Sequence, residues 1–175
     1  MTITSTLQIT TPSDREIAMT RVFDAPRALV FDAFTKPELV RRWLTGPDGW
    51  EFAVCDIDLR PGGKYRYVWR KAGVPDMGMG GQFREVVPPE RYVATEQFDE
   101  SWYPGSAIVT TAMTEHGGKT TVTLTIKYDS KDARDVALKS GMETGVAASY
   151  NRLDRILVSR RSGAAAKADQ CFSVA

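Results

Sequence analysis

The sequence predicts an α+β fold in which an antiparallel sheet packs against helices. Strand-like alternation of apolar and polar residues recurs through the middle of the chain, most regularly at 64–70 and 119–128. Gly- and Pro-rich turn signals separate these segments. Helical periodicity is limited to two short segments before residue 45 and to 131–158. The predicted order is therefore one strand, two short helices, many strands and one long helix.

The first elements follow from local signals. Residues 1–13 are rich in Thr and Ser, and we expect either an edge strand or an unstructured arm. Glu16 to Phe23 alternates as a strand and ends before Pro26, which suits the first turn of a helix. A second short helix is expected to begin near Pro37.

Turn chemistry divides the central part into strands. Residues 71–80 are expected to form a flexible connection. The hairpin turn at His116-Gly117-Gly118 joins the last two strands. With the first strand, this predicts a sheet of about six or seven strands, the later ones lying at 50–59, 64–70, 81–87, 91–98, 107–115 and 119–128.

The segment 131–158 is predicted to be a single long helix. Its inward stripe consists of Val136, Met142, Val146, Ser149, Leu153, Ile156 and Leu157. Gly141 and Gly145 lie on this stripe, where each glycine costs about 1 kcal/mol relative to alanine. We expect a compensation, either a close approach of the sheet, which we favour, or space for a ligand. Residues 159–175 show no sustained period and are predicted to be a disordered tail.

Length and composition are those of an ordinary globular domain. The 175 residues are 42% hydrophobic and 26% charged. The 23 basic and 22 acidic residues leave a net charge of +1, which argues against nucleic acid because phosphate binding needs a basic excess. No apolar run approaches the roughly 18 residues of a membrane span, and the first residues lack a signal peptide's pattern. We therefore expect a cytoplasmic protein without a membrane span.

The few cysteine and histidine residues exclude several kinds of site. Cys55 and Cys171 cannot build a disulfide framework and suit a reducing compartment. The single histidine, His116, excludes a metal site with two imidazoles. Phosphate-binding and dinucleotide motifs are also missing. The sequence therefore predicts no metal site, no cofactor and no assigned catalytic residue.

Motifs in a fixed order identify a family resemblance. They are the segments 21–27, 30–35, 37–38, 58–63 and 81–91, then Gly141-Met142-Glu143, Gly145 and Arg152-Leu153. Over about residues 15–158, the chain resembles the family related to the activator of heat-shock-protein-90 ATPase, in the START-like (SRPBCC) superfamily. The resemblance implies the helix-grip fold of birch-pollen-allergen-like proteins, a curved antiparallel sheet around a long C-terminal helix. Val146 departs from the family, which usually has Trp there, and leaves less bulk beside the helix.

Large side chains occupy positions expected to face the gap between sheet and helix. The candidate ligand-binding residues are Trp43, Trp50, Phe52, Tyr65, Tyr67, Trp69, Phe83, Phe98, Met113, Met142, Gly145 and Val146. Met77 and Met79 are placed in the connection at the mouth, either as adaptable contacts or as buried anchors. These residues either fill a core or line a pocket for a small apolar or aromatic molecule. For the set as a whole, we favour the pocket.

Glu85 is the acidic residue of most interest, because it lies in a strand among apolar neighbours. Paired with Arg84 or Arg91, it would be structural, the interpretation that we favour. Buried without a partner, it would have a raised pKa and could act as an acid or base.

Three function classes remain open. The favoured one is a module that binds a small hydrophobic ligand, as a monomer or a homodimer. The resemblance also implies contact with a chaperone, or a polyketide-cyclase-like enzyme. Against the chaperone class, we expect no separate N-terminal domain of the kind found in the eukaryotic co-chaperone; against the enzyme class, no cluster of Asp, Glu, His and Tyr with catalytic spacing can be named.

Overall fold

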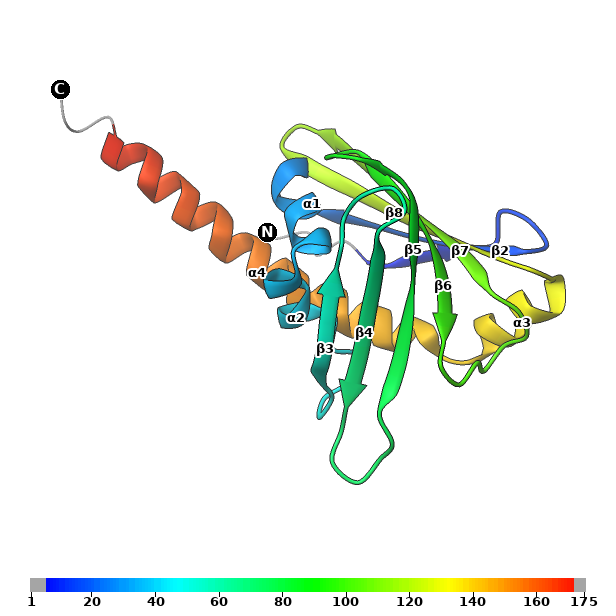
Figure 1. Ribbon diagram of the computed structural model, residues 1–175. Coiled ribbons are helices and arrows are strands. Elements are labelled where there is room, and N and C mark those ends of the chain that lie inside the picture. Colours follow the sequence, from blue (N-terminus) through cyan, green and yellow to red (C-terminus); the bar gives the residue numbers. More distant parts are fainter. Residues whose placement is uncertain (1–5, 172–175) are drawn as a thin grey trace.

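The computed structural model describes residues 6–171, with side chains through residue 163. It confirms an α+β helix-grip fold, in which a curved antiparallel sheet wraps around a long C-terminal helix (Figure 1). The sheet has eight strands in the order β1-β2-β8-β7-β6-β5-β4-β3. The strands are β1 (Gln8–Thr10), β2 (Glu16–Phe23), β3 (Glu51–Ile57), β4 (Lys64–Arg70), β5 (Met77–Val87), β6 (Arg91–Phe98), β7 (Ala107–His116) and β8 (Lys119–Tyr128). The helices are α1 (Arg27–Thr35), α2 (Pro37–Trp43), α3 (Lys131–Lys139) and α4 (Met142–Cys171).

The N-terminal arm contributes the edge strand. β1 pairs antiparallel with β2, with Gln8 opposite Thr20. This strand is the eighth, so the sheet is larger than the six or seven strands expected. Residues 1–5 lie outside the described residues.

The predicted single helix over 131–158 is wrong, because two helices occupy this segment. α3 begins at a Ser130 cap, whose Oγ accepts a hydrogen bond from the Ala133 amide at 3.1 Å. Gly141 has φ +79°, a left-handed conformation that suits glycine and ends a helix. The break also explains why Val136, expected to point inward, is 42% exposed.

The predicted disordered tail is also wrong for residues 159–171, where α4 continues to Cys171. The segment Ala164-Ala165-Ala166 has the highest helix propensity, which outweighs the lack of an amphipathic period. α4 projects beyond the sheet at this end (Figure 1). Near the point where it leaves the domain, Arg161 pairs with Asp24 at 2.7 Å. The expected tail residues 172–175 lie outside the described residues.

β5 begins at Met77, so the predicted connection over 71–80 is too long. Met77 pairs with Trp69 of β4, which places Met77 and Met79 in a strand. Gly78 leaves room for an ion pair on the outer face, because a Cβ there would lie 2.1 Å from Asp99 Oδ2 and 2.5 Å from Arg66 Nη2. The glycines that indicated a loop therefore belong to β5, and at Gly78 the side chains of Arg66 and Asp99 occupy the space where a Cβ would lie.

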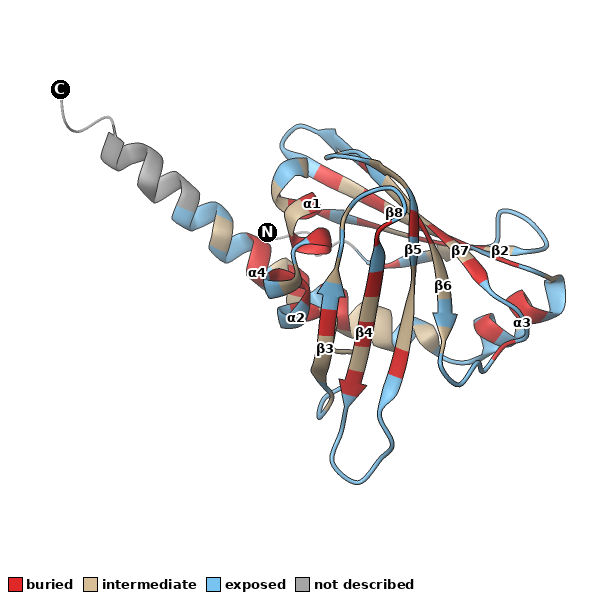
Figure 2. Cartoon of the chain, in the orientation of Figure 1, coloured by how far each residue is buried: buried red, intermediate tan, exposed pale blue. Residues whose placement is uncertain are grey.

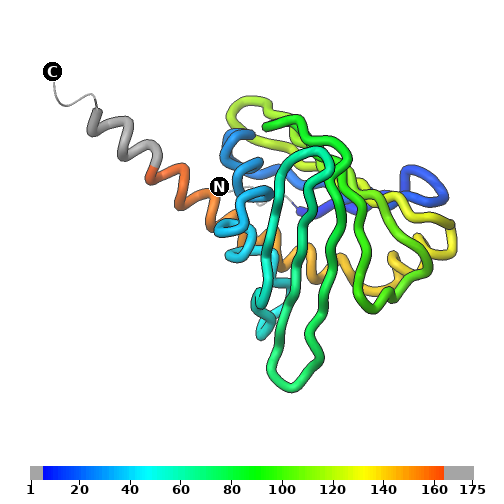
Figure 3. Tube along the Cα trace, viewed as in Figure 1, coloured from blue at the N-terminus to red at the C-terminus, as the bar shows by residue number. Residues whose placement is uncertain are grey.

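The core consists of two clusters on the concave side of the sheet. Figure 2 shows buried residues recurring along the strands and on α1, α2 and the part of α4 under the sheet. The larger cluster joins β2, β7 and β8 to α1 and α4, with Phe34 and Tyr150 rings 6.0 Å apart. The smaller cluster is largely aromatic and centres on β4, with one buried residue each from α2, β3, β5 and β6. α1 and α2 pack beside α4 and close one side of the domain (Figure 3).

A buried charge fixes α4 against the sheet. Arg21 of β2 is 2% exposed, forms an ion pair with Asp154 and donates from Nη1 to Asn151 Oδ1 at 2.8 Å. Burial raises the pKa of Asp154, and the Arg21 charge opposes that rise. Both partners lie on α4, so the contact sets the position of the helix over the space between the two clusters. Within the described residues, no helix combines the length and hydropathy of a membrane span.

Candidate functional site

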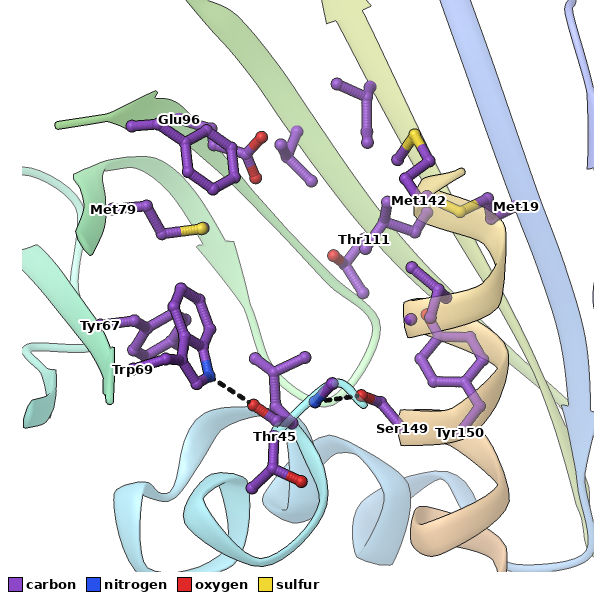
Figure 4. Close-up of a pocket in the computed structure, with 18 of the residues that line it drawn as sticks. Met19, Thr45, Tyr67, Trp69, Met79, Glu96, Thr111, Met142, Ser149 and Tyr150 are labelled. Atoms are coloured by element: carbon purple, nitrogen blue, oxygen red, sulfur yellow. Dashed lines mark hydrogen bonds between the residues drawn. The ribbon is translucent and has the colours of Figure 1, made fainter. Parts of the chain in front are cut away.

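A cavity of about 660 Å³ lies between the concave face of the sheet and α4 (Figure 4). This volume is within the range of small-molecule sites, about 300–1,000 Å³. Side chains from β4 to β8, the loop after α2 and the first turns of α4 line it. Among the described residues that line it, Glu96 is the only Asp, Glu, Lys, Arg or His. The lining is therefore apolar and aromatic with one carboxyl group.

Most of the predicted site residues meet at this cavity. Those that line it are Trp43, Trp50, Tyr65, Tyr67, Trp69, Met77, Met79, Phe83, Phe98, Met142, Gly145 and Val146. Figure 4 shows Tyr67, Trp69 and Met79 opposite α4. Phe52, Glu85 and Met113 do not line it.

Glu85 lies outside the cavity because of a β-bulge in β5. Phe83 pairs with Ala94, but Glu85 pairs with Val93, so two residues of β5 oppose one of β6. The extra residue reverses the alternation and turns Glu85 away from the concave face. Its carboxylate forms an ion pair with Arg91 at 2.5 Å, with 40% of the Glu85 side chain exposed. The structural interpretation is therefore correct, and a role for Glu85 as acid or base in the cavity is wrong.

Phe52 and Met113 belong to the core. The Phe52 ring packs against Trp69 and Tyr67, with centroids 5.2 and 5.6 Å away. Met113 is 2% exposed and belongs to the larger cluster. For these two residues, the core-filling alternative describes the structure.

The polar atoms of several lining rings are bound to the backbone. These hydrogen bonds run from Trp43 Nε1 to Ala33 O (2.9 Å), Tyr65 Oη to Thr95 O (2.8 Å) and Trp69 Nε1 to Leu44 O (2.7 Å). A buried indole or phenol donor would otherwise carry a desolvation cost. With these donors satisfied, the rings present apolar surface to the cavity.

The loop after α2 is tied to α4. The Gly46 amide donates to Ser149 Oγ at 3.1 Å, and Figure 4 shows this bond beside that from Trp69. Arg152 donates to the Gly46 carbonyl oxygen and, at 2.8 Å, to Asp48 Oδ1. These bonds hold the loop as one wall of the cavity.

Gly145 leaves open space rather than a close contact with the sheet. A Cβ at this position would meet only Pro47 Cδ, at 4.0 Å. At Gly141, a Cβ would meet nothing within 4 Å. The close approach of the sheet that we favoured for these glycines is therefore wrong, and at Gly145 the alternative, space beside the helix, is what the structure contains.

Glu96 was missed by sequence reasoning, although its strand carries the signal. Tyr92, Ala94, Glu96 and Phe98 alternate along β6, and all four line the cavity. The Glu96 carboxyl accepts a 3.4 Å hydrogen bond from the Tyr103 hydroxyl. Glu96 keeps some accessible surface because it borders the cavity, but protein surrounds its carboxyl group. This burial raises the pKa of Glu96 to about 7. The Tyr103 hydrogen bond opposes that rise.

Thr111 of β7 places a second polar group at the cavity. It is fully buried, and its Oγ1 has no hydrogen-bond partner among the described residues. Burial raises the pKa of the nearby Tyr92 to about 12, and an interaction of its phenol with the Thr111 side chain opposes that rise. Figure 4 shows Thr111 and Glu96 at the cavity on neighbouring strands, and the register places them four positions apart, because Thr111 pairs with Tyr92 and Glu96 with Ala107.

Exposed lining residues mark the mouth of the cavity. Met77 is 42% and Trp102 38% exposed. Pro47, Ser140 and Gly141 are also exposed and line it. The mouth therefore lies between the start of β5, the loop after β6 and the break between α3 and α4. In the part of the chain with described side chains, no group of three or more His, Cys, Asp or Glu residues could hold a metal ion.

Comparison with known proteins agrees with this architecture. Residues 24–158 match the family model described as "Activator of Hsp90 ATPase homolog 1-like protein". A crystal structure from Rhodobacter sphaeroides is 28% identical with a TM-score of 0.83, covering 88% of this chain and 99% of that chain. A solution structure from Staphylococcus epidermidis is 28% identical with a TM-score of 0.73, covering 87% and 94%.

A third similar structure supports the fold alone. This crystal structure, from Mycobacterium smegmatis, is 23% identical with a TM-score of 0.77 and covers 89% of this chain and 99% of that chain. No curated protein matches the chain. The family match spans most of the chain and includes β3 to β8, the loop after α2 and the part of α4 that lines the cavity. The chain belongs to the Activator of Hsp90 ATPase homolog 1-like family.

Proposed function

We propose that the protein binds a small apolar or aromatic molecule in the cavity between the sheet and α4. The observation that carries the proposal is the combination of volume and lining. About 660 Å³ is bordered by aromatic rings and methionines, with one carboxyl group. Protein interiors are otherwise packed with few voids larger than a water molecule. A space of this size is therefore a feature to be explained by an occupant.

The lining favours an aromatic occupant. Tyr65, Tyr67 and Trp69 form a row on β4 with neighbouring centroids 5.2 and 5.8 Å apart. Such rings stack on aromatic ligands at offset or edge-to-face geometries. Met79 and Met142 face the cavity from opposite sides, and unbranched thioethers adapt to ligands of different shape (Figure 4).

The cavity favours binding over two-residue acid–base catalysis. Such catalysis needs a positioned acid and a positioned base. Apart from the tyrosine phenols, the described lining supplies only Glu96 as a titratable group. We therefore place the function in recognition of a small molecule.

The proposal is tested by nuclear magnetic resonance with N-phenyl-1-naphthylamine, a neutral aromatic probe. We expect saturable shifts of the Gly145 and Val146 amides and of the Trp69 indole N–H, at one probe per chain. The Gly117 and Gly118 amides, which lie in the exposed β7–β8 turn, serve as the control and should not move. Absence of shifts at the cavity, or shifts confined to exposed residues, would overturn the proposal.

A further inference from the structure

The charge at the cavity wall narrows the class of ligand. Resting on the proposed function, we infer that the preferred occupant is a lipophilic organic cation, an aromatic or aliphatic amine whose charged nitrogen contacts Glu96. Two features of the site lead to this assignment: the charges that line it and the rings around the carboxyl.

Apart from the tyrosine phenols, the one ionisable side chain that lines the described cavity is a carboxyl group. Glu96 is the only Asp, Glu, Lys, Arg or His among the described lining residues, so no basic side chain lines the cavity to neutralise it. Arg66 of β4 is held by Asp99 at 2.6 Å on the exposed outer face and does not line the cavity. A buried carboxylate is stable only when it is paired or hydrogen-bonded. Glu96 has the long hydrogen bond from Tyr103 but no ion pair among the described residues, and a cationic ligand would supply one.

The surroundings of Glu96 are electron-rich rings. Three tyrosines lie near Glu96: Tyr65 on β4, Tyr103 after β6 and Tyr128 on β8. The negative charge of Glu96 contributes to the raised pKa of each of these phenols. Phe98 and Trp102 also line this end of the cavity, with centroids 5.7 Å apart. Aromatic faces attract organic cations, and the attraction is stronger where water is excluded.

Thr111 is a separate polar group farther along the cavity. Its hydroxyl is buried without a hydrogen-bond partner of normal geometry in the described part of the chain. Thr111 pairs with Tyr92, and Glu96 pairs with Ala107, so the two residues lie four positions apart along the strands, about 13 Å. The charged nitrogen is therefore assigned to Glu96 alone, where an anion would meet repulsion.

The arrangement makes binding depend on pH. Burial raises the pKa of Glu96 to about 7, so the empty cavity holds a neutral acid below this pH and a carboxylate above it. A bound ammonium favours the carboxylate. Affinity for an amine should therefore rise as pH increases through about 7 and then level off, as long as the amine stays protonated.

The test compares three naphthalenes that differ in one substituent: 2-naphthylmethylamine, 2-naphthylmethanol and 2-naphthoate. Calorimetric titrations at pH 5.5 and pH 8 use the unmodified protein, Glu96→Gln and a matched control, Glu85→Gln. Glu85 is a carboxylate on the same sheet that does not line the cavity. Thermal unfolding of each variant shows that it is folded.

We expect the amine to bind roughly tenfold or more tightly than the alcohol at pH 8, and to lose about that factor at pH 5.5. Glu96→Gln should remove this advantage and leave alcohol binding unchanged, and Glu85→Gln should change neither. Equal or tighter binding of the alcohol or the naphthoate at pH 8 would overturn the inference while leaving the proposed function intact. If none of the three binds the folded protein, the proposed function fails with it.

Discussion

The indole Nε1 of Trp69 donates a 2.7 Å hydrogen bond to the backbone carbonyl oxygen of Leu44. This bond links β4 to the first residue after α2, so a strand in the middle of the smaller core cluster holds the loop at the cavity wall. It also uses the only polar atom of the indole and leaves the ring as apolar lining.

Trp69→Phe should therefore destabilise the protein through the lost hydrogen bond. The Leu44 carbonyl would lose its partner, at a cost of about 1–3 kcal/mol in the free energy of unfolding. Trp50→Phe is the control, because Trp50 lines the cavity and its side chain makes no hydrogen bond among the described residues. Urea unfolding measures both. Equal losses in the two variants would mean that ring size, rather than the hydrogen bond, matters.

Glu96→Gln should alter the pH dependence of stability. The folded-state pKa of Glu96, about 7, lies above the usual 4.5, so the folded protein holds this proton more tightly than the unfolded chain. The contribution of Glu96 to stability therefore falls as pH rises from about 4.5 to 7 and is constant above that, a cost of the order of 3 kcal/mol. Glutamine does not titrate.

The melting temperature of Glu96→Gln should exceed that of the unmodified protein at pH 8, and the difference should shrink toward pH 5. Thermal unfolding across this range measures it without added ligand. A difference that stays constant with pH would show that the Glu96 carboxyl does not titrate in this window.

Cys55 should be unreactive in the folded protein. Burial raises its pKa to about 11, and its thiol donates to the Pro37 carbonyl oxygen at 3.8 Å. At pH 8 only about 0.1% would be thiolate, the reactive form. In a Cys171→Ser variant, Ellman's reagent should label Cys55 roughly a hundredfold more slowly in the folded than in the guanidinium-unfolded protein. Comparable rates would show that β3 opens readily at this position.

Deleting residues 163–175 should have little effect on stability. The deletion keeps Arg161 and its exposed ion pair with Asp24, and surface pairs of this kind contribute about 0–1 kcal/mol. We expect the melting temperature to change by no more than about 2 °C. A loss of several degrees would mean that the end of α4 contacts the domain.

The fold could be predicted from the sequence because its signals are local. Alternation placed β2 and β4 at their observed bounds, and Pro26 and Pro37 marked the starts of α1 and α2. The errors occur where glycine has more than one structural use. Gly78 indicated a loop but lies in β5, and Gly141 indicated close packing but ends a helix.

The site was predicted in outline, because period-two alternation shows which rings share a face. It could not show the bulge after Phe83, which depends on pairing with β6 and turns Glu85 outward. The same pairing leaves Glu96 inward, in line with Ala94 and Phe98. Which acidic residue faces the cavity is thus decided by strand register, a non-local property that a single sequence does not state.

Gly145→Leu shows whether the space beside α4 is an open ligand site. A leucine there would extend from a Cβ whose nearest neighbour is 4.0 Å away. Gly163→Leu is the matched control, because it gives the same gain in helix propensity, about 1 kcal/mol, at an exposed position of α4.

The measurement is the affinity for N-phenyl-1-naphthylamine together with the free energy of unfolding. We predict that Gly145→Leu is at least as stable as the unmodified protein and has lost the probe, while Gly163→Leu binds it normally. A Gly145→Leu variant destabilised by about 1–3 kcal/mol relative to Gly163→Leu, from a parent that does not bind the probe, would mean that the space is a filled core and no ligand site.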